Sequence, residues 1–424
     1  MKRKNLLSES VIYLASNIMT AGVPFLLLPL LTKYLTPAQY GEVAMFQTMI
    51  GFFGAFVGLS CHLFVARKYY DFKSREEKAA LNGACFQVIF LTSGILLIVN
   101  FFFQDWLSRI FGLPEPFLFL GVLVCAATAV IQIRLVCWQV RHSPKSYGFA
   151  QVGQALLNLS LSIVLVVFLL MASEGRILAQ SVSVLVIFSI SVRLMYADNL
   201  IKLFSIVPKY VVEILKFGVP LIPHVLGIFL LVTVDRFVIN SELGLGQTGI
   251  YMVGVQIAAG LSIIFDGLNK AFVPWLYSNL KKENPEVDRL IVRVVYAGFL
   301  ASLSIGITLF YMLPLLIPYV IDEKYHAVSG FIGWLLIGQI LAGMYLVFAN
   351  FIFYSKKTGW LSVVSISCGF LNVFLLIVLL KPLGIHGAAI AFCTAMALRM
   401  LLAWFVAFYR HPMPWLGKFL YSRV

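Results

Sequence analysis

The chain has 424 residues, of which 61% are hydrophobic and only 12% are charged, whereas soluble domains carry charge on about a quarter of their residues. The net charge of +14 would fit a nucleic-acid-binding protein, but no recognition helix, zinc finger or RNA-binding motif accompanies the basic residues. The composition therefore excludes a string of soluble domains and predicts an integral membrane protein with no nucleic-acid partner.

The apolar residues are gathered in runs long enough to cross a bilayer. A hydrocarbon core about 30 Å thick needs about 20 apolar residues per helix. Twelve such runs are separated by charged or Gly/Pro-rich breaks: 11–32, 41–66, 80–103, 117–139, 148–172, 177–196, 217–237, 249–274, 291–313, 330–354, 360–380 and 386–409. The sequence therefore predicts an all-α protein with twelve transmembrane helices.

Lysines and arginines are distributed unevenly over the connections between these spans. Most of them fall in every second connection, beginning with the basic cluster before the first span. The other connections hold few basic residues: Lys33, Arg109, Arg176, Arg236, Lys324 and Lys381. Because basic loops remain on the cytoplasmic side of a membrane, we expect a multi-pass protein with both termini in the cytoplasm.

The longest connection lies at the middle of the chain, between the sixth and seventh spans. Its apolar residues alternate with lysines and are interrupted at Pro208, which is typical of an amphipathic segment at the membrane interface. We therefore expect two six-helix bundles, 1–196 and 217–424, joined by an interfacial linker, 197–216.

The two predicted bundles share short motifs in corresponding positions. Gly22-Val23-Pro24 in the first span recurs as Gly218-Val219-Pro220 in the seventh. Each bundle has an even number of spans, so the two would enter the membrane in the same sense, as parallel repeats around a central cavity.

Other motifs resemble those of a known transporter family. They are Leu35–Gly41 (LTPAQYG), Lys216–Pro223 (KFGVPLIP) and Gly384–Ala389 (GIHGAA). With the length and the span count, they are similar to bacterial polysaccharide repeat-unit flippases of the Wzx type, which serve O-antigen or capsule synthesis. These flippases belong to the multidrug/oligosaccharidyl-lipid/polysaccharide exporter superfamily.

This resemblance implies a function, a location and a set of partners. The function is alternating-access transfer of an undecaprenyl-pyrophosphate-linked oligosaccharide from the cytoplasmic to the outer leaflet of the bacterial plasma (inner) membrane. The partners are membrane lipid, H⁺ or Na⁺ as a coupling ion, and glycan polymerase and chain-length proteins. The first span lacks the basic residues that flippases for the peptidoglycan precursor carry there, which speaks against that substrate.

Basic side chains inside spans are the natural candidates for contact with a pyrophosphate, because intramembrane charges are costly and usually functional. Arg399 is the deepest, about 18 Å into the last span at about 1.5 Å per residue. Arg134, Arg236 and Lys270 are further candidates for substrate binding. The alternative for each is a structural role, through pairing with an acidic group or anchoring at the interface.

Coupling or gating is assigned to Asp235, Asp266 and His224. Asp235 and Arg236 are adjacent and point about 100° apart on a helix, so they do not form a simple pair. Asp266 and Lys270 are four residues apart and can form an ion pair on one helix face. Histidine is the side chain type that can change charge near neutral pH, so His224 is a candidate for linking transport to protons; the alternative is a hydrogen-bonded core histidine.

The sequence lacks the motifs of several classes of enzyme. It contains no ATP-binding Gly-x-x-x-x-Gly-Lys-Ser/Thr loop, no His-Glu-x-x-His and no Gly-x-Ser-x-Gly. The six cysteines lie in apolar runs without Cys-x-x-Cys spacing, which indicates core residues. We therefore predict no enzymatic activity, catalytic residue, cofactor or metal site. The main alternative function is an ion-coupled drug or metabolite exporter, which an acidic rather than a basic cavity would favour.

Overall fold

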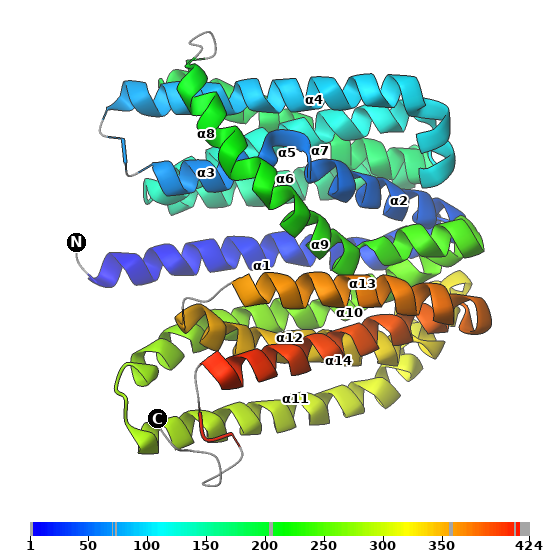
Figure 1. Ribbon diagram of the computed structural model, residues 1–424. Coiled ribbons are helices and arrows are strands. Elements are labelled where there is room, and N and C mark those ends of the chain that lie inside the picture. The colour runs from blue at the N-terminus through cyan, green and yellow to red at the C-terminus, as the bar shows by residue number, and fades with distance from the viewer. Residues whose placement is uncertain are drawn as a thin grey trace. The chain divides into compact units, whose positions relative to one another are not determined.

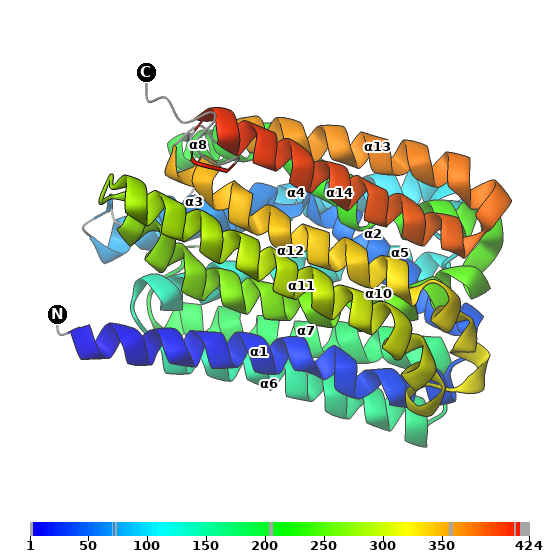
Figure 2. The same ribbon diagram turned by 90° about the horizontal axis from the view of Figure 1, so that it is seen from below.

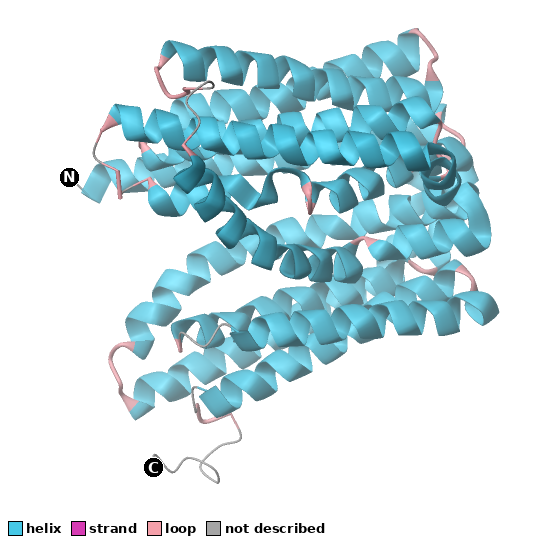
Figure 3. Ribbon diagram, turned by 45° about the horizontal axis from the view of Figure 1, so that its top comes forward, coloured by secondary structure: helices cyan, strands magenta, loops and turns pink. Residues whose placement is uncertain are grey.

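The computed structural model describes residues 3–69, 71–72, 74–202, 207–355, 359–410 and 413–415, with side chains from Val11 onward. These parts of the chain are helical and contain no β-strand (Figure 3). Eleven of the described helices are long and apolar enough to cross a membrane, and one bent helix pair makes a twelfth candidate span. The predicted all-α transmembrane fold class is confirmed.

Two compact units divide the chain. The first comprises Met1–Phe229 and Gly244–Gly249, and the second comprises Leu230–Leu243 and Ile250–Val424. The helices described up to Val232 are α1 (Arg3–Tyr34), α2 (Pro37–Gly54), η1 (Val57–Ser60), α3 (Cys61–Lys68), α4 (Arg75–Phe111), α5 (Glu115–Val140), α6 (Pro144–Ser162), the π-helical turn η2 (Ile163–Phe168), α7 (Ala172–Ala197), α8 (Pro208–Gly218), η3 (Val219–Leu221) and α9 (Ile222–Val232).

Helix starts in the first unit follow from local sequence. Thr36 precedes Pro37 and forms a capping box with Gln39: the Thr36 hydroxyl accepts from the Gln39 N–H, and the Gln39 side chain accepts from the Thr36 N–H. Ser74 and Glu77 form the same motif before α4. Such caps satisfy N–H groups that have no partner inside the helix. The sequence therefore fixes these boundaries without help from tertiary contacts.

Helix α5 provides much of the core of the first unit. Its residues Val124, Ala127, Ile131, Leu135 and Trp138 are buried in one cluster with residues of α7, as their spacing of three or four residues on one helix face allows. Helix α1 packs along α6 (Figure 2). A Cβ at Gly148 of α6 would lie only 2.5 Å from the Ser16 hydroxyl of α1, so glycine permits this close approach.

The predicted second span is two helices rather than one. Helix α2 and the segment Val57–Lys68 are bent by 60° at a short break. Gly58 (φ 71°), Leu59 (φ 45°) and Ser60 (φ 55°) all have left-handed backbone conformations there. The Gly58 N–H donates to the hydroxyl of Thr92 on α4 at 3.1 Å, so one backbone group freed by the break is satisfied by a neighbouring helix.

The predicted interfacial linker is described only in part, because residues 203–206 lie outside the described ranges. Helix α8 begins at Pro208, where a proline costs no intrahelical hydrogen bond. It runs obliquely past α3 and α4 (Figure 1) and continues through the 3₁₀ turn η3 at Pro220 into α9. Thus the seventh span starts within the segment predicted as linker.

The second unit is built from six further elements, of which α10 also contributes Gly244–Gly249 to the first unit. They are α10 (Val234–Leu280), α11 (Pro285–Val320), η4 (Glu323–Gly330), α12 (Ile332–Tyr354), α13 (Gly359–Leu383) and α14 (Ile385–Arg410). Helix α12 is the most enclosed, with 67% of its span buried. It packs against α11 and α14, and α14 packs against α13 (Figure 2).

The long helix α10 starts directly after a helix break and is interrupted once near its start. It follows a break at Thr233, and Gly244 (φ 80°, ψ 175°) is non-helical within it. The predicted seventh span, 217–237, extends past the observed helix, which ends at Val232, and Asp235 and Arg236 lie in the first turn of α10. Hydropathy could not show the break, since apolar residues flank it on both sides.

Candidate functional site

A polar cavity lies inside the first unit, surrounded by α1, α5, α6 and α7. Its volume is about 310 Å³ and Arg176 of α7 contributes to its wall, so we call it the Arg176 cavity. Its other polar lining residues are Thr20, Thr128, Gln132, Gln151, Gln154 and Asn158. No carboxylate lines it. Amide, hydroxyl and guanidinium groups thus meet between helices that are apolar enough to cross a membrane.

Arg176 is 6% exposed and is held by α6. Its Nη1 donates to Asn158 Oδ1 at 2.7 Å and to Ser162 Oγ at 3.1 Å. Its Nε has no hydrogen-bond partner, and none of the ion pairs found among the described residues involves it. The Arg176 cavity therefore contains a cation that no counter-charge compensates. Such a buried charge is energetically costly.

The expectation that Arg176 lies in a loop is wrong, because α7 begins at Ala172 and encloses it. The predicted sixth span begins directly after Arg176, because a charged residue interrupts an apolar run. A charged residue near the end of a span usually belongs to a loop. A signal was nevertheless present: Ser173, Arg176, Gln180 and Ser183 follow helical spacing, which places polar groups on one face of an apolar helix.

A second cavity, of about 240 Å³, adjoins the break between α2 and α3. It is lined by Gly58, Ser60 and His62, and it shares Thr128 and Gln132 with the Arg176 cavity. Non-helical backbone at membrane depth is tolerated where it is buried in protein or lines a cavity. The broken span therefore lies on the same polar interior of the first unit as Arg176.

Arg399, the main predicted site residue, lies in the second unit on α14. Its guanidinium carbon is 3.8 Å from the centre of the Tyr345 ring of α12, and its Nη2 donates to Ser365 Oγ of α13 at 3.4 Å. Its Nε has no hydrogen-bond partner, and no described carboxylate pairs with it. The ring positions the cation without neutralising it.

Arg134 has a different environment. It is 2% exposed, its Nη2 lies 2.8 Å from Asp198 Oδ2, and its guanidinium lies over Trp138. Arg141 Nη1 is 3.5 Å from the same carboxylate oxygen. This cluster joins α5 to the end of α7 and neutralises Arg134, which fits the structural alternative for that residue.

The remaining predicted residues fall into two local groups, apart from His224, which is exposed on α9. Asp235 is buried and accepts from Tyr251 Oη at 2.8 Å and from the Arg236 N–H at 2.9 Å. The Arg236 side chain turns to Met252 Sδ, so the two do not pair through their side chains.

The second group is the predicted pair on α10. The i, i+4 pair of Asp266 and Lys270 is confirmed, at 2.9 Å with both side chains more than half exposed. None of the seven predicted site residues lines the Arg176 cavity.

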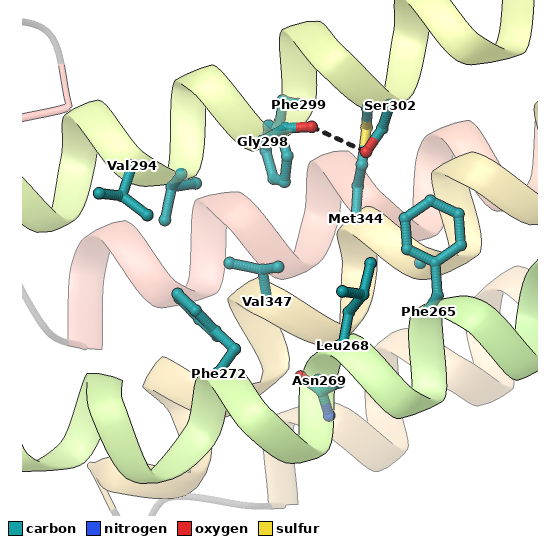
Figure 4. Close-up of a pocket in the computed structure, with 12 residues that line it drawn as sticks. Phe265, Leu268, Asn269, Phe272, Val294, Gly298, Phe299, Ser302, Met344 and Val347 are labelled. Carbon is teal, nitrogen blue, oxygen red and sulfur yellow. Dashed lines mark hydrogen bonds between the residues drawn. The ribbon is translucent and has the colours of Figure 1, made fainter.

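An apolar pocket of about 230 Å³ lies in the second unit between α10, α11 and α12 (Figure 4). Phe265, Leu268 and Phe272 of α10 face it, and its polar groups are Asn269 and Ser302. Ser302 Oγ donates to the Gly298 carbonyl, and Asn269 accepts from Asn350. Both polar groups are thus engaged within the protein, and the pocket suits an apolar group rather than a charged one.

Comparison with known proteins gives a consistent family. The model of the polysaccharide biosynthesis protein family matches residues 6–280. Two proteins of Haemophilus influenzae are similar over most of their length. "Lsg locus putative protein 1" is 26% identical, and the matched region covers 84% of this chain and 87% of that protein. An "uncharacterized membrane protein" is 28% identical, with 85% and 87% covered.

Solved structures share the fold at low sequence identity. An inward-facing multidrug resistance MATE family transporter of the MOP superfamily has a TM-score of 0.73 at 15% identity, covering 94% of this chain and 97% of that one. The lipid II flippase MurJ in an inward closed conformation has a TM-score of 0.71 at 14% identity, with 94% and 87% covered. At these identities the likeness shows a common fold, and function has to be argued from the site.

Proposed function

Because the chain belongs to the polysaccharide biosynthesis protein family, the family that the residue motifs resemble, we propose that it flips an undecaprenyl-pyrophosphate-linked oligosaccharide repeat unit from the cytoplasmic to the outer leaflet. The observation that carries this proposal is the pair of arginines inside candidate spans, Arg176 and Arg399, neither of which has a carboxylate partner among the described residues. Such cations fit an anionic cargo.

The chemistry of the cargo explains why a protein is needed. Sugar hydroxyls lose their hydrogen bonds to water if they enter hydrocarbon alone, and a pyrophosphate would also lose its hydration. Polar cavities inside a helical bundle replace these interactions, while the lipid tail remains in the bilayer. Arginine binds phosphate oxygens through two parallel N–H groups, and Arg399 leaves its Nε free of protein partners. We assign Arg399 to the pyrophosphate.

The same proposal includes alternating access and the orientation inferred from the loops. Both termini would face the cytoplasm, because basic connections remain on that side, and the protein would lie in the bacterial plasma membrane. Glycan polymerase and chain-length proteins would receive the flipped product. Either H⁺ or Na⁺ would drive the cycle. Loss of flipping after collapse of the proton gradient alone, with Na⁺ retained, would identify protons as the coupling ion.

Gene removal tests the function directly. We expect the lipid-linked repeat unit to accumulate in the cytoplasmic leaflet and surface glycan to be lost, with both restored by the wild-type gene. Arg399→Ala should restore less than a tenth of the glycan at equal membrane abundance, because hydrogen bonds to charged groups are worth about 1.5–3 kcal/mol.

One control variant and two refuting outcomes complete this test. Arg193→Ala, at an exposed position of α7, should restore glycan fully. Normal glycan without the gene would overturn the function, and normal glycan with Arg399→Ala would remove this residue from the site.

A drug or metabolite exporter is the second candidate, and the likeness to a MATE transporter favours it at the level of fold. Its discriminator is the charge of the cavity, because a cationic drug requires an acidic lining. The Arg176 cavity has an arginine and no carboxylate in its lining. The buried acid Asp235 is already bonded to Tyr251. These observations favour the anionic cargo.

A further inference from the structure

We infer that the Arg176 cavity is a binding site for one acidic monosaccharide unit, with Arg176 receiving the sugar carboxylate and the surrounding amides receiving its hydroxyls. This inference rests on the proposed function, because the sugar would be part of the translocated glycan. It concerns a different arginine, in a different unit of the chain, from the residue assigned to the pyrophosphate.

The first argument is charge. Arg176 is buried, with 6% of its surface exposed, and its two hydrogen-bond acceptors, Asn158 and Ser162, are neutral. Removing one member of a buried ion pair costs several kcal/mol because the remaining charge is left uncompensated. A single carboxylate from a ligand would supply the missing charge, and the free Nε offers a donor for it.

The second argument is the composition of the lining. Side-chain amides both donate and accept hydrogen bonds, as sugar hydroxyls do. Gln132, Gln151, Gln154 and Asn158 line the cavity from α5 and α6, and Gln151 Oε1 is buried without a hydrogen-bond partner. An acceptor left unsatisfied in this way costs about 1–3 kcal/mol. A ligand hydroxyl donating to Gln151 would satisfy it.

The third argument is size and charge balance against a pyrophosphate. The volume of about 310 Å³ leaves room for a sugar ring. A pyrophosphate diester carries two negative charges, while Arg176 is the one basic residue in the described lining. A monocarboxylate therefore matches the cavity better than a pyrophosphate.

One internal group competes for the role of counter-charge. Glu42 of α2 accepts a hydrogen bond from the hydroxyl of Ser173, three residues before Arg176 in α7. If Glu42 neutralised Arg176 through water, the cavity would need no anionic ligand. The variant Glu42→Gln separates the two cases. It leaves carboxylate binding within about threefold of the wild type if the ligand is the partner, and it strengthens binding at least tenfold if Glu42 is.

The experiment uses the purified full chain in detergent, with binding measured by isothermal titration calorimetry. The probes are D-glucuronate, D-glucose and inorganic pyrophosphate at equal ionic strength. We expect glucuronate to bind at least tenfold more tightly than glucose and more tightly than pyrophosphate. Arg176→Gln should weaken glucuronate binding at least tenfold while changing glucose binding less than threefold, and Arg193→Ala should change neither.

Several results would overturn the inference. They are equal binding of glucuronate and glucose, tighter binding of pyrophosphate, unchanged glucuronate affinity in Arg176→Gln, and the strengthening in Glu42→Gln described above. The thermal unfolding transition of the ligand-free variant shows whether Arg176→Gln still folds. We expect its transition temperature to be equal to or higher than that of the wild type, because the change removes an unpaired buried charge. If Arg176→Gln unfolds, the test uses Arg176→Lys, which keeps the charge and loses the bidentate geometry. This variant should bind glucuronate with intermediate affinity. Wild-type affinity would refute the role of the guanidinium.

This test is independent of flipping. Glucuronate binding needs no lipid carrier, so its absence would refute the sugar site while leaving the gene-removal result intact. Conversely, normal surface glycan without the gene would refute the flippase even if glucuronate bound through Arg176.

Discussion

The ion pair between Arg134 and Asp198 gives a sharp test of whether Arg134 is structural. The change Asp198→Asn keeps the side-chain shape and removes the charge that neutralises Arg134. Arg134 is 2% exposed and its Nε and Nη1 already lack partners. Breaking a buried pair costs about 3–5 kcal/mol. The Asp198 side chain is 41% exposed and the stacking on Trp138 remains, so we expect a loss of about 1.5–3 kcal/mol.

The measurement is the free energy of unfolding, from circular dichroism during titration with a denaturing detergent in mixed micelles. The control is Glu76→Gln, which removes the exposed pair with Lys202, where the two side chains are 82% and 47% exposed. Exposed pairs contribute about 0–1 kcal/mol, so its effect should be well below that of Asp198→Asn. Equal losses for the two variants, or lost glycan export at unchanged stability in Asp198→Asn, would refute the structural role.

Two further changes test the broken span and the second unit. Gly58→Ala should lower the free energy of unfolding by about 1–3 kcal/mol, because the residue has φ 71° and a Cβ would lie 3.1 Å from side chains of two neighbouring helices. The control is Gly54→Ala, where a Cβ meets no atom within 4 Å and the free energy of unfolding should change by less than about 0.5 kcal/mol. Equal effects of the two changes would show that the left-handed break is not required. Tyr345→Leu should reduce glycan export several-fold, because Arg399 loses the ring that positions it, a contact worth about 0.5–2 kcal/mol. The control Tyr345→Phe keeps the ring and should keep export near normal. Similar export in both variants would refute the positioning role of Tyr345.

Much of the fold could be predicted because membrane physics acts locally along the chain. A bilayer demands about 20 apolar residues per helix, and each predicted run coincides with a described helix or helix pair. The capping boxes at Thr36 and Ser74 and the pair of Asp266 with Lys270 depend on spacings of three or four residues. Such features need no knowledge of distant segments.

The break in the second span could not be predicted from the sequence. Leu59 and Ser60 are ordinary residues that rarely adopt left-handed conformations, and no proline marks the position. What stabilises the break is tertiary: Thr92 of α4 accepts from the Gly58 N–H, and Gly58 leaves space for Ala129 of α5. Hydropathy registers only a continuous apolar run there.

Composition, span length and short motifs identify a helical membrane protein of a polysaccharide-related family, because each of them is a property of contiguous residues. Tertiary structure alone separated its intramembrane arginines by what surrounds them. Arg134 meets Asp198 from 64 positions away, whereas Arg176 meets the neutral Asn158 and Ser162. In a medium of low dielectric constant, the presence or absence of a counter-charge within a few ångströms decides whether a buried cation is satisfied or available to a ligand, and that distance is set by how helices pack.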